Sequence, residues 1–165
     1  MASILTVQDF VGKYELSITE ETEIKLQFYI DRLEVSLLRE LFGLDLYTLW
    51  DGSVNPIYTI LTAPLVFQED ACEGKIWESK GLVDMLIGFI YFEYSRDAYT
   101  QQTVDGAQKN AGENSLNSTF AMANLHGRYS EALTSYEAIQ AYIKKESVIY
   151  PEFHGIKKHV LIPFF

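Results

Sequence analysis

The stretch that decides the fold runs from Trp77 to Thr119 and reads WESKGLVDMLIGFIYFEYSRDAYTQQTVDGAQKNAGENSLNST. Its first half is dense in apolar and aromatic residues, which predicts a helix that is capped by Ser79, reaches about Tyr99 and is buried on more than one face. Its second half, residues 100–116, is polar and rich in Gly and Asn, so we expect a long loop that cannot bury itself. A large polar loop on a helical frame usually serves something outside its domain.

Two glycines interrupt the apolar run, at Gly81 and Gly88. Glycine costs a helix up to about 1 kcal/mol relative to alanine. We therefore expect these positions to permit the close approach of another backbone.

Two further long helices flank this stretch. Upstream, Ser17 and Glu20 have the spacing of a capping box, and the glutamates of the first turn favour the helix N-terminus. We expect this helix to run to Phe42 and to end at Gly43, with a stripe of apolar residues at helical spacing: Leu26, Ile30, Leu33, Leu37 and Leu41. Downstream, the last helix is expected from residue 117 or 118 to residue 144 or 145.

The remaining segments are shorter. Thr6 can cap a short helix from Val7 to Val11. Residues 44–50 favour one more helical turn, and residues 57–67 favour an extended strand or an irregular apolar segment. Residues 75–77 are expected to pair back on the preceding segment as a small hairpin.

Together these elements predict a mainly α fold, a bundle of three to four helices with a small irregular or β-hairpin insertion and an extended C-terminal tail. At 165 residues one domain is expected. We assign residues 1–145 to this domain, with the insertion at about 44–77 and the polar loop at about 100–117, and residues 146–165 to the tail.

The charge is unevenly distributed. The formal net charge is −10, and all of this excess lies in the first 100 residues. An acidic chain is a poor binder of nucleic acid, because phosphate binding needs a basic surface. The first residues lack the pattern of a secretory leader, and the single Cys72 fits a reducing compartment. No apolar run approaches the roughly 20 residues of a membrane span.

Catalytic and metal-binding patterns are missing from the sequence. His126, His154 and His159 lack the spacing of metal ligands on a helix, and acidic neighbours disfavour a reactive thiolate at Cys72. There is no phosphate loop, dinucleotide fingerprint or nucleophile elbow. We therefore expect no metal, no cofactor and no enzymatic activity.

The C-terminal tail combines a basic centre with apolar ends. Its apolar side chains are exposed unless they dock on something. One alternative is docking on the chain's own domain, and the other is docking in a groove of a neighbouring protein. As candidate partner-binding residues for the second alternative we take Phe153, His154, Leu161, Ile162, Phe164 and Phe165.

The order of these parts resembles the head-to-tail adaptor proteins of tailed bacteriophages, also called head-completion or connector proteins. It is most similar to the version found in phages of Bacteroidetes-type hosts, including the crAss-like group. The resemblance covers most of residues 1–145, although the middle segment 44–77 departs from the simplest adaptors. It is carried by Leu5–Phe10, Lys13-Tyr14, Leu41–Gly43, Lys80–Leu82, Phe89–Phe92 with Tyr94 and Arg96, Gln102-Thr103 with Gly106, and Gly112–Ser115.

This resemblance implies a structural virion protein without catalytic activity. Such proteins form a ring, here expected to be twelvefold, that joins the portal vertex to the tail and lines the channel through which DNA is ejected. The implied partners are further copies of the chain, the portal protein and other neck or tail ring proteins. DNA passes nearby without specific binding, and no membrane is involved. The implied locations are the phage neck in the virion and, during assembly, the host cytoplasm.

Within such a ring, the polar loop would contact a neighbouring subunit or face the channel. Its candidate residues are Tyr99, Gln101, Gln102, Asn110, Glu113 and Asn114. Two alternatives stay open at this point. The chain could be another tail-completion ring component, or a cytoplasmic helical protein-interaction module.

Overall fold

The computed structural model of the chain describes residues 3–16, 19–50, 56–68, 74–103, 106–109 and 116–155. These residues confirm a mainly helical fold with a small β-hairpin insertion. The elements are η1 (Val7–Asp9), η2 (Gly12–Tyr14), α1 (Glu20–Leu49), α2 (Pro56–Thr62), β1 (Leu65–Gln68), β2 (Ile76–Ser79), α3 (Leu82–Tyr99), β3 (Thr100–Thr103), β4 (Gly106–Lys109) and α4 (Leu116–Lys145).

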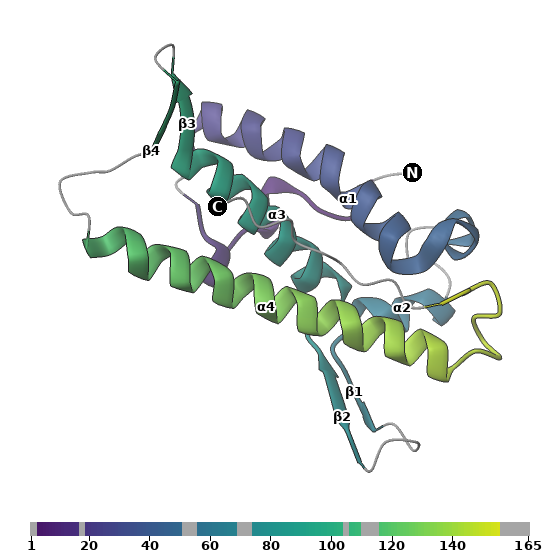
Figure 1. The fold of residues 1–165 in the computed structure, drawn as a ribbon. Helices are drawn as coiled ribbons and strands as arrows, with labels where there is room; N and C mark the ends of the chain where they lie inside the picture. The colour runs from purple at the N-terminus through teal and green to yellow at the C-terminus, as the bar shows by residue number, and fades with distance from the viewer. Residues whose placement is uncertain are drawn as a thin grey trace.

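Helix α3 is the centre of the bundle. It packs against both α1 and α4, whereas α1 and α4 contact each other much less (Figure 1). A Cβ atom at Gly88 would lie only 2.8 Å from Cβ of Ala132 on α4, so the predicted close approach is confirmed. Burial on several faces is also confirmed, by Leu82, Met85, Leu86, Phe89, Ile90 and Phe92.

The junction between β2 and α3 depends on Gly81. Its φ of 97° is in the region that favours glycine, and an added Cβ would overlap the carbonyl oxygen of Thr62. The prediction that Ser79 caps α3 is wrong, because Ser79 is the last residue of β2. Its Oγ accepts a hydrogen bond from the backbone N–H of Gly81 at 3.0 Å, which stabilises the turn rather than the helix.

Helix α1 is longer than predicted and contains a break. Its cap is Thr19, whose Oγ1 accepts a hydrogen bond from Thr22 N at 3.2 Å, and not Ser17, which lies outside the described residues. Gly43 has a non-helical φ of 76°, after which the helix continues to Leu49. The predicted interruption at Gly43 and the further helical turn after it are therefore both confirmed.

Helix α4 supports this break in α1. The buried side chain of Gln140 donates a hydrogen bond from Nε2 to the backbone oxygen of Leu41 at 3.1 Å. Carbonyl groups near the end of a helical segment lose their intrahelical partners, and a buried one must find another. The observed start of α4 at Leu116 and its end at Lys145 agree with the prediction to within one or two residues.

The insertion contains one element that the sequence did not predict correctly. Residues 56–62 form helix α2 and not a strand or irregular segment. Pro56 is the first residue of α2, where proline is favoured, and a short apolar run alone cannot distinguish strand from helix. The predicted hairpin is confirmed, since β1 and β2 pair antiparallel with Leu65 opposite Ser79 and Gln68 opposite Ile76.

The polar segment after α3 is not simply a loop. Strands β3 and β4 pair antiparallel, with Gln101 opposite Gln108 and Gln102 opposite Ala107. The prediction of a polar loop over residues 100–116 is therefore wrong for this part, which forms a hairpin. Backbone pairing can form a hairpin even where apolar alternation, the usual sequence signal of a strand, is missing.

The predicted short helix after Thr6 is a 3₁₀ helix that ends at Asp9, and a second 3₁₀ helix follows it. This N-terminal segment is attached to α1 by Glu34, whose buried carboxylate accepts hydrogen bonds from Ser3 Oγ at 2.7 Å, Ile4 N at 2.9 Å and Leu5 N at 3.1 Å. A buried carboxylate needs such donors, and they come from a segment about 30 residues away.

Candidate functional site

The β1–β2 hairpin extends beyond the helices and carries the clearest exposed apolar pair (Figure 1). Leu65 and Ser79 are buried at its base, while the next pair in the register, Val66 and Glu78, faces outward. Val66 and Ile76 on this outward face are 70% and 69% exposed. Exposed apolar side chains that gather on one protruding element often mark a protein contact.

Two contacts hold this hairpin against α4. The rings of Phe67 and Tyr142 pack edge to face with centroids 5.4 Å apart. Lys145 Nζ donates a hydrogen bond to the backbone oxygen of Gln68 at 3.0 Å. The inner face of the hairpin is therefore fixed to the bundle, and its outer face is presented to solvent.

A second hairpin, β3–β4, leaves the opposite end of α3 (Figure 1). Tyr99 is the last residue of α3, and Gln101 and Gln102 belong to β3. Three other predicted loop residues, Asn110, Glu113 and Asn114, lie outside the described residues. Gln101 and Gln102 therefore lie on one protruding strand.

Polar contacts hold the end of α3 from which β3 leaves. Tyr29 of α1 donates a hydrogen bond to Asp97 Oδ2 at 2.6 Å, and Arg96 forms an ion pair with Glu93 at 2.6 Å. Burial, followed by the hydrogen bond to Asp97, raises the pKa of Tyr29 to about 12. Tyr29 therefore stays a neutral donor at physiological pH.

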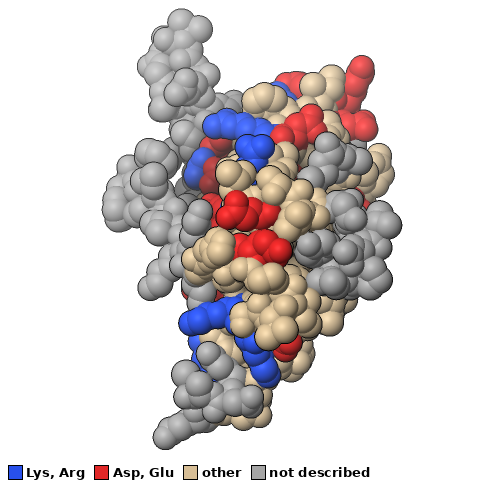
Figure 2. Space-filling model, turned by 90° about the vertical axis from the view of Figure 1, so that its right-hand side faces the viewer, with Lys and Arg blue, Asp and Glu red and all other residues tan. Residues whose placement is uncertain are grey.

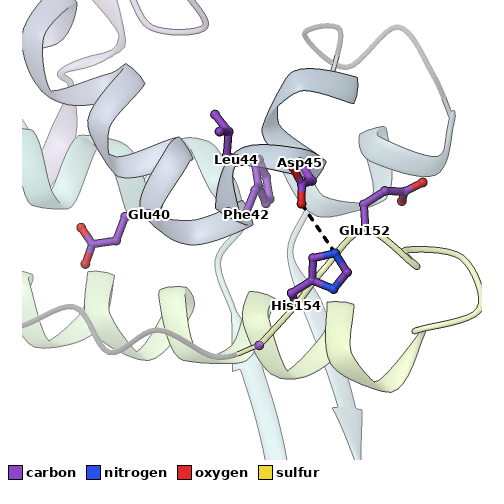
Figure 3. A pocket seen from close by; sticks show the side chains of 8 residues that line it. Glu40, Phe42, Leu44, Asp45, Glu152 and His154 are labelled. Carbon is purple, nitrogen blue, oxygen red and sulfur yellow. Dashed lines mark ion pairs between the residues drawn. The ribbon is translucent and has the colours of Figure 1, made fainter.

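A pocket lies where α1 is broken at Gly43. It has a volume of about 220 Å³, and residues from α1 and from the segment after α4 line it. Asp45 and His154 point toward each other across it, with 3.6 Å between Oδ2 and Nε2, whereas the carboxylates of Glu40 and Glu152 point away from the imidazole (Figure 3).

Both members of this pair are highly exposed, so it contributes little to stability. The side chains do not converge as metal ligands would, and no group of three or more His, Cys, Asp or Glu residues in the described part of the chain could hold a metal ion.

Figure 2 shows the face of the molecule that lies on the right-hand side of Figure 1. Acidic side chains lie near the middle of this face, with basic ones above and below them.

A network of charged side chains joins the N-terminal segment, α3 and α4. Glu131 on α4 accepts a hydrogen bond from Lys13 at 2.7 Å and another from Lys80 at 2.6 Å. These two hydrogen bonds lower the pKa of Glu131 to about 2. Glu131 thus remains ionised at physiological pH, and the network fixes the positions of the elements around it. It contains no nucleophile paired with a base.

The described part of the predicted tail lies against the bundle. Tyr150 is buried, and Phe153 is partly buried against the same core. His154 is exposed at the pocket described above. The other predicted partner-binding residues, Leu161, Ile162, Phe164 and Phe165, lie outside the described residues.

Comparison with known proteins gives no match, whether with protein-family models, with curated proteins or with solved structures. The resemblance to phage adaptors therefore stays a prediction. Among the described helices, none combines the length and the apolar character that crossing a bilayer requires. Sequence reasoning missed the outward pair on β1–β2, because neither LVFQ nor IWES alternates apolar with polar residues, and only the register of the two strands places Val66 and Ile76 on one face.

Proposed function

We propose that this chain is a structural protein of a tailed-phage neck, which assembles into an oligomeric ring between the portal vertex and the tail. The observation that carries the proposal is the β1–β2 hairpin, which protrudes from the bundle with Val66 and Ile76 exposed on its outer face. Association through such side chains removes apolar surface from water.

A second exposed apolar pair supports a contact between different surfaces of neighbouring copies. Ile24 and Phe28 lie one helical turn apart near the start of α1 and are 66% and 59% exposed. The start of α1 and the β1–β2 hairpin are on opposite sides of the molecule (Figure 1). A contact between two different surfaces generates a ring when its rotation closes, which is the symmetry that a neck component needs.

The charge of the chain supports the same function. Its net charge of −10 would repel DNA phosphates, so DNA could pass through the centre of such a ring without adhering. The proposal includes no catalytic activity, and its partners are further copies of the chain, the portal protein and neighbouring ring proteins.

Electron microscopy of the purified chain, alone and mixed with the portal protein encoded in the same genome, tests this proposal. We expect closed rings with a central channel, or a ring attached to the portal. A chain that forms no ring in either sample and is missing from purified virions would contradict the proposed function.

A further inference from the structure

We infer that the outer face of β1–β2 in one copy of the chain docks on an exposed stripe near the start of α1 in the next copy, with an ion pair between Glu78 and Arg32 that sets the register. This inference rests on the proposed assembly of copies and names the two surfaces that meet. The order of side chains on each surface, the rigidity of both surfaces and two charges that are free to pair support it.

The outer face of the hairpin presents three side chains in a fixed order. Successive residues of a strand point to opposite faces, so Val66 and Glu78, which are paired across the hairpin, share this face with Ile76. Val66 and Glu78 lie nearer the base, and Ile76 lies two residues further toward the tip. Residues two apart on one strand are separated by about 6.4–6.8 Å. The face is therefore apolar, with one carboxylate at the end nearer the bundle.

The start of α1 repeats this order at helical spacing. Ile24, Phe28 and Arg32 follow one another at intervals of four residues, and all three are exposed. Side chains four residues apart lie on the same side of a helix, about 6 Å apart along its axis. We call these three residues the α1 stripe. Because its spacing is similar to that of the hairpin face, the two apolar pairs can lie against each other while Glu78 reaches Arg32.

Glu78 and Arg32 are both available for such a pair. Both are exposed, and neither side chain forms an ion pair or a hydrogen bond with another of the described residues. Lys25, another cation in these turns of α1, is already paired with Glu21 at 2.5 Å. The adjacent Asp31 accepts a hydrogen bond from a glutamine one turn before it at 2.8 Å. Arg32 is therefore the cation that the α1 stripe offers to a partner.

Both surfaces are supported from behind. Phe28 packs edge to face on Tyr29 with ring centroids 6.0 Å apart, and Tyr29 packs in the same way on Tyr94 of α3 at 5.6 Å. The hairpin is held against α4 by the contacts of Phe67 and Lys145 described above. A surface that is ordered before binding loses less conformational entropy on association. The hairpin face and the α1 stripe can therefore meet without rearranging.

The charges favour contact between the two different surfaces over contact of either surface with itself. The hairpin face and the α1 stripe lie on opposite sides of the molecule, so the partner of each is a second copy (Figure 1). Two hairpin faces together would bring two Glu78 carboxylates onto one small interface, and two α1 stripes would do the same with Arg32. Like charges placed opposite each other weaken association and exclude that arrangement. Each copy therefore uses both surfaces, as a head-to-tail ring requires.

Mixing two variants tests which surfaces meet. One variant, Val66→Glu with Ile76→Glu, lacks the hairpin face, and the other, Ile24→Glu with Phe28→Glu, lacks the α1 stripe. Each variant alone should be a folded monomer in size-exclusion chromatography coupled to light scattering, with circular dichroism as the check on folding. The equimolar mixture retains one intact contact, so it should give a complex of two chains and no larger assembly.

Two results would overturn the inference alone. In the first, the unmodified chain assembles but the mixture stays monomeric or forms larger assemblies. In the second, the variant without the α1 stripe assembles by itself, because the hairpin face would then bind another surface. A monomeric unmodified chain would contradict the inference together with the proposed assembly. A two-chain complex from a protein that is missing from virions would contradict only the proposed function.

Exchange of the two charges in this mixed complex gives a second readout. Glu78→Arg is added to the variant that keeps its hairpin face, and Arg32→Glu to the variant that keeps its α1 stripe. Either change alone should raise the dissociation constant about threefold to tenfold, since an attractive contact becomes repulsive, and both together should restore it to within about twofold.

The matched control replaces Glu78→Arg by Glu137→Arg, the same charge change at an exposed position on α4. It should not restore binding to the Arg32→Glu partner. Equal dissociation constants for the Glu78→Arg and Glu137→Arg combinations would show that Glu78 and Arg32 do not meet, and would overturn the register that we infer.

Discussion

The two hairpins leave opposite ends of α3, yet their sequences differ in apolar content. In β1–β2, the burial of successive residues alternates, and Phe67 packs against Tyr142 of α4. In β3–β4, the sequences TQQT and GAQK contain one apolar residue, Ala107. An isolated two-stranded hairpin is marginally stable in water, so packing against a neighbour stabilises it. Contact with α4 makes β1–β2 part of the bundle, whereas the sequences of β3 and β4 offer little apolar surface for such packing.

Substitution of Gly81, which joins β2 to α3, should have the largest effect on the stability of the fold. Gly81→Ala places a Cβ against the Thr62 carbonyl oxygen at a positive φ. We expect the free energy of unfolding to fall by roughly 2–4 kcal/mol, measured by urea denaturation. Gly127→Ala on α4 is the control, because an added Cβ there meets nothing within 4 Å, and it should be neutral or stabilise by up to about 1 kcal/mol. Equal effects at the two glycines would contradict this account.

Removal of the aromatic anchor of β1–β2 should have the next largest effect. Phe67→Ala loses the contact with Tyr142 and part of its burial, so we expect a loss of about 1–2 kcal/mol in unfolding free energy. The matched change in the other hairpin, Gln101→Ala, should stay within about 0.5 kcal/mol. If the Gln101 variant is the more destabilised of the two, then β3–β4 is the hairpin that supports the bundle.

The sequence predicted the long helices well because their signals are repeated. The apolar stripe of α1 recurs over several turns, so a single residue that departs from the pattern does not obscure it. Gly43 and Gly88 were recognised because glycine is costly inside a helix and therefore marks a break or a close approach. The apolar stripe and these two glycines were therefore sufficient to predict the long helices from the sequence.

Short elements and long-range contacts could not be predicted in the same way. Helix α2 and strands β3 and β4 contain too few residues for a period to be measured. The burial of Glu34 depends on Ser3, Ile4 and Leu5, and its neighbours in α1 give no sign of them. The outward pair Val66 and Ile76 becomes a candidate site only once the register of β1 and β2 is known.

The smallest expected effect concerns Lys80, which follows β2 directly and holds the hairpin junction to Glu131 of α4. The pKa of Glu131 is lowered from its ordinary value of 4.5 to about 2. A lowered pKa stabilises the fold above the unfolded value, so this contribution should be lost as the pH falls from about 4.5 to about 2. Because Glu131 is 45% exposed, solvent screening reduces the expected loss to about 1 kcal/mol.

Thermal unfolding followed across this pH range measures the effect. Glu131→Gln should flatten the pH dependence in this window, while Glu137→Gln, an exposed change on the same helix, should leave it as in the unmodified chain. An unaltered slope in the Glu131 variant would show that the network does not contribute to stability.

The central claim is that the outer face of β1–β2 forms the contact between copies, and light scattering coupled to size-exclusion chromatography tests it most directly. The unmodified chain should elute as a closed oligomer, and the double variant Val66→Glu, Ile76→Glu as a folded monomer. The control Val11→Glu, Val148→Glu changes two other exposed valines and should still assemble. Oligomers of equal mass in both double variants, or a monomer in all three proteins, would contradict the account.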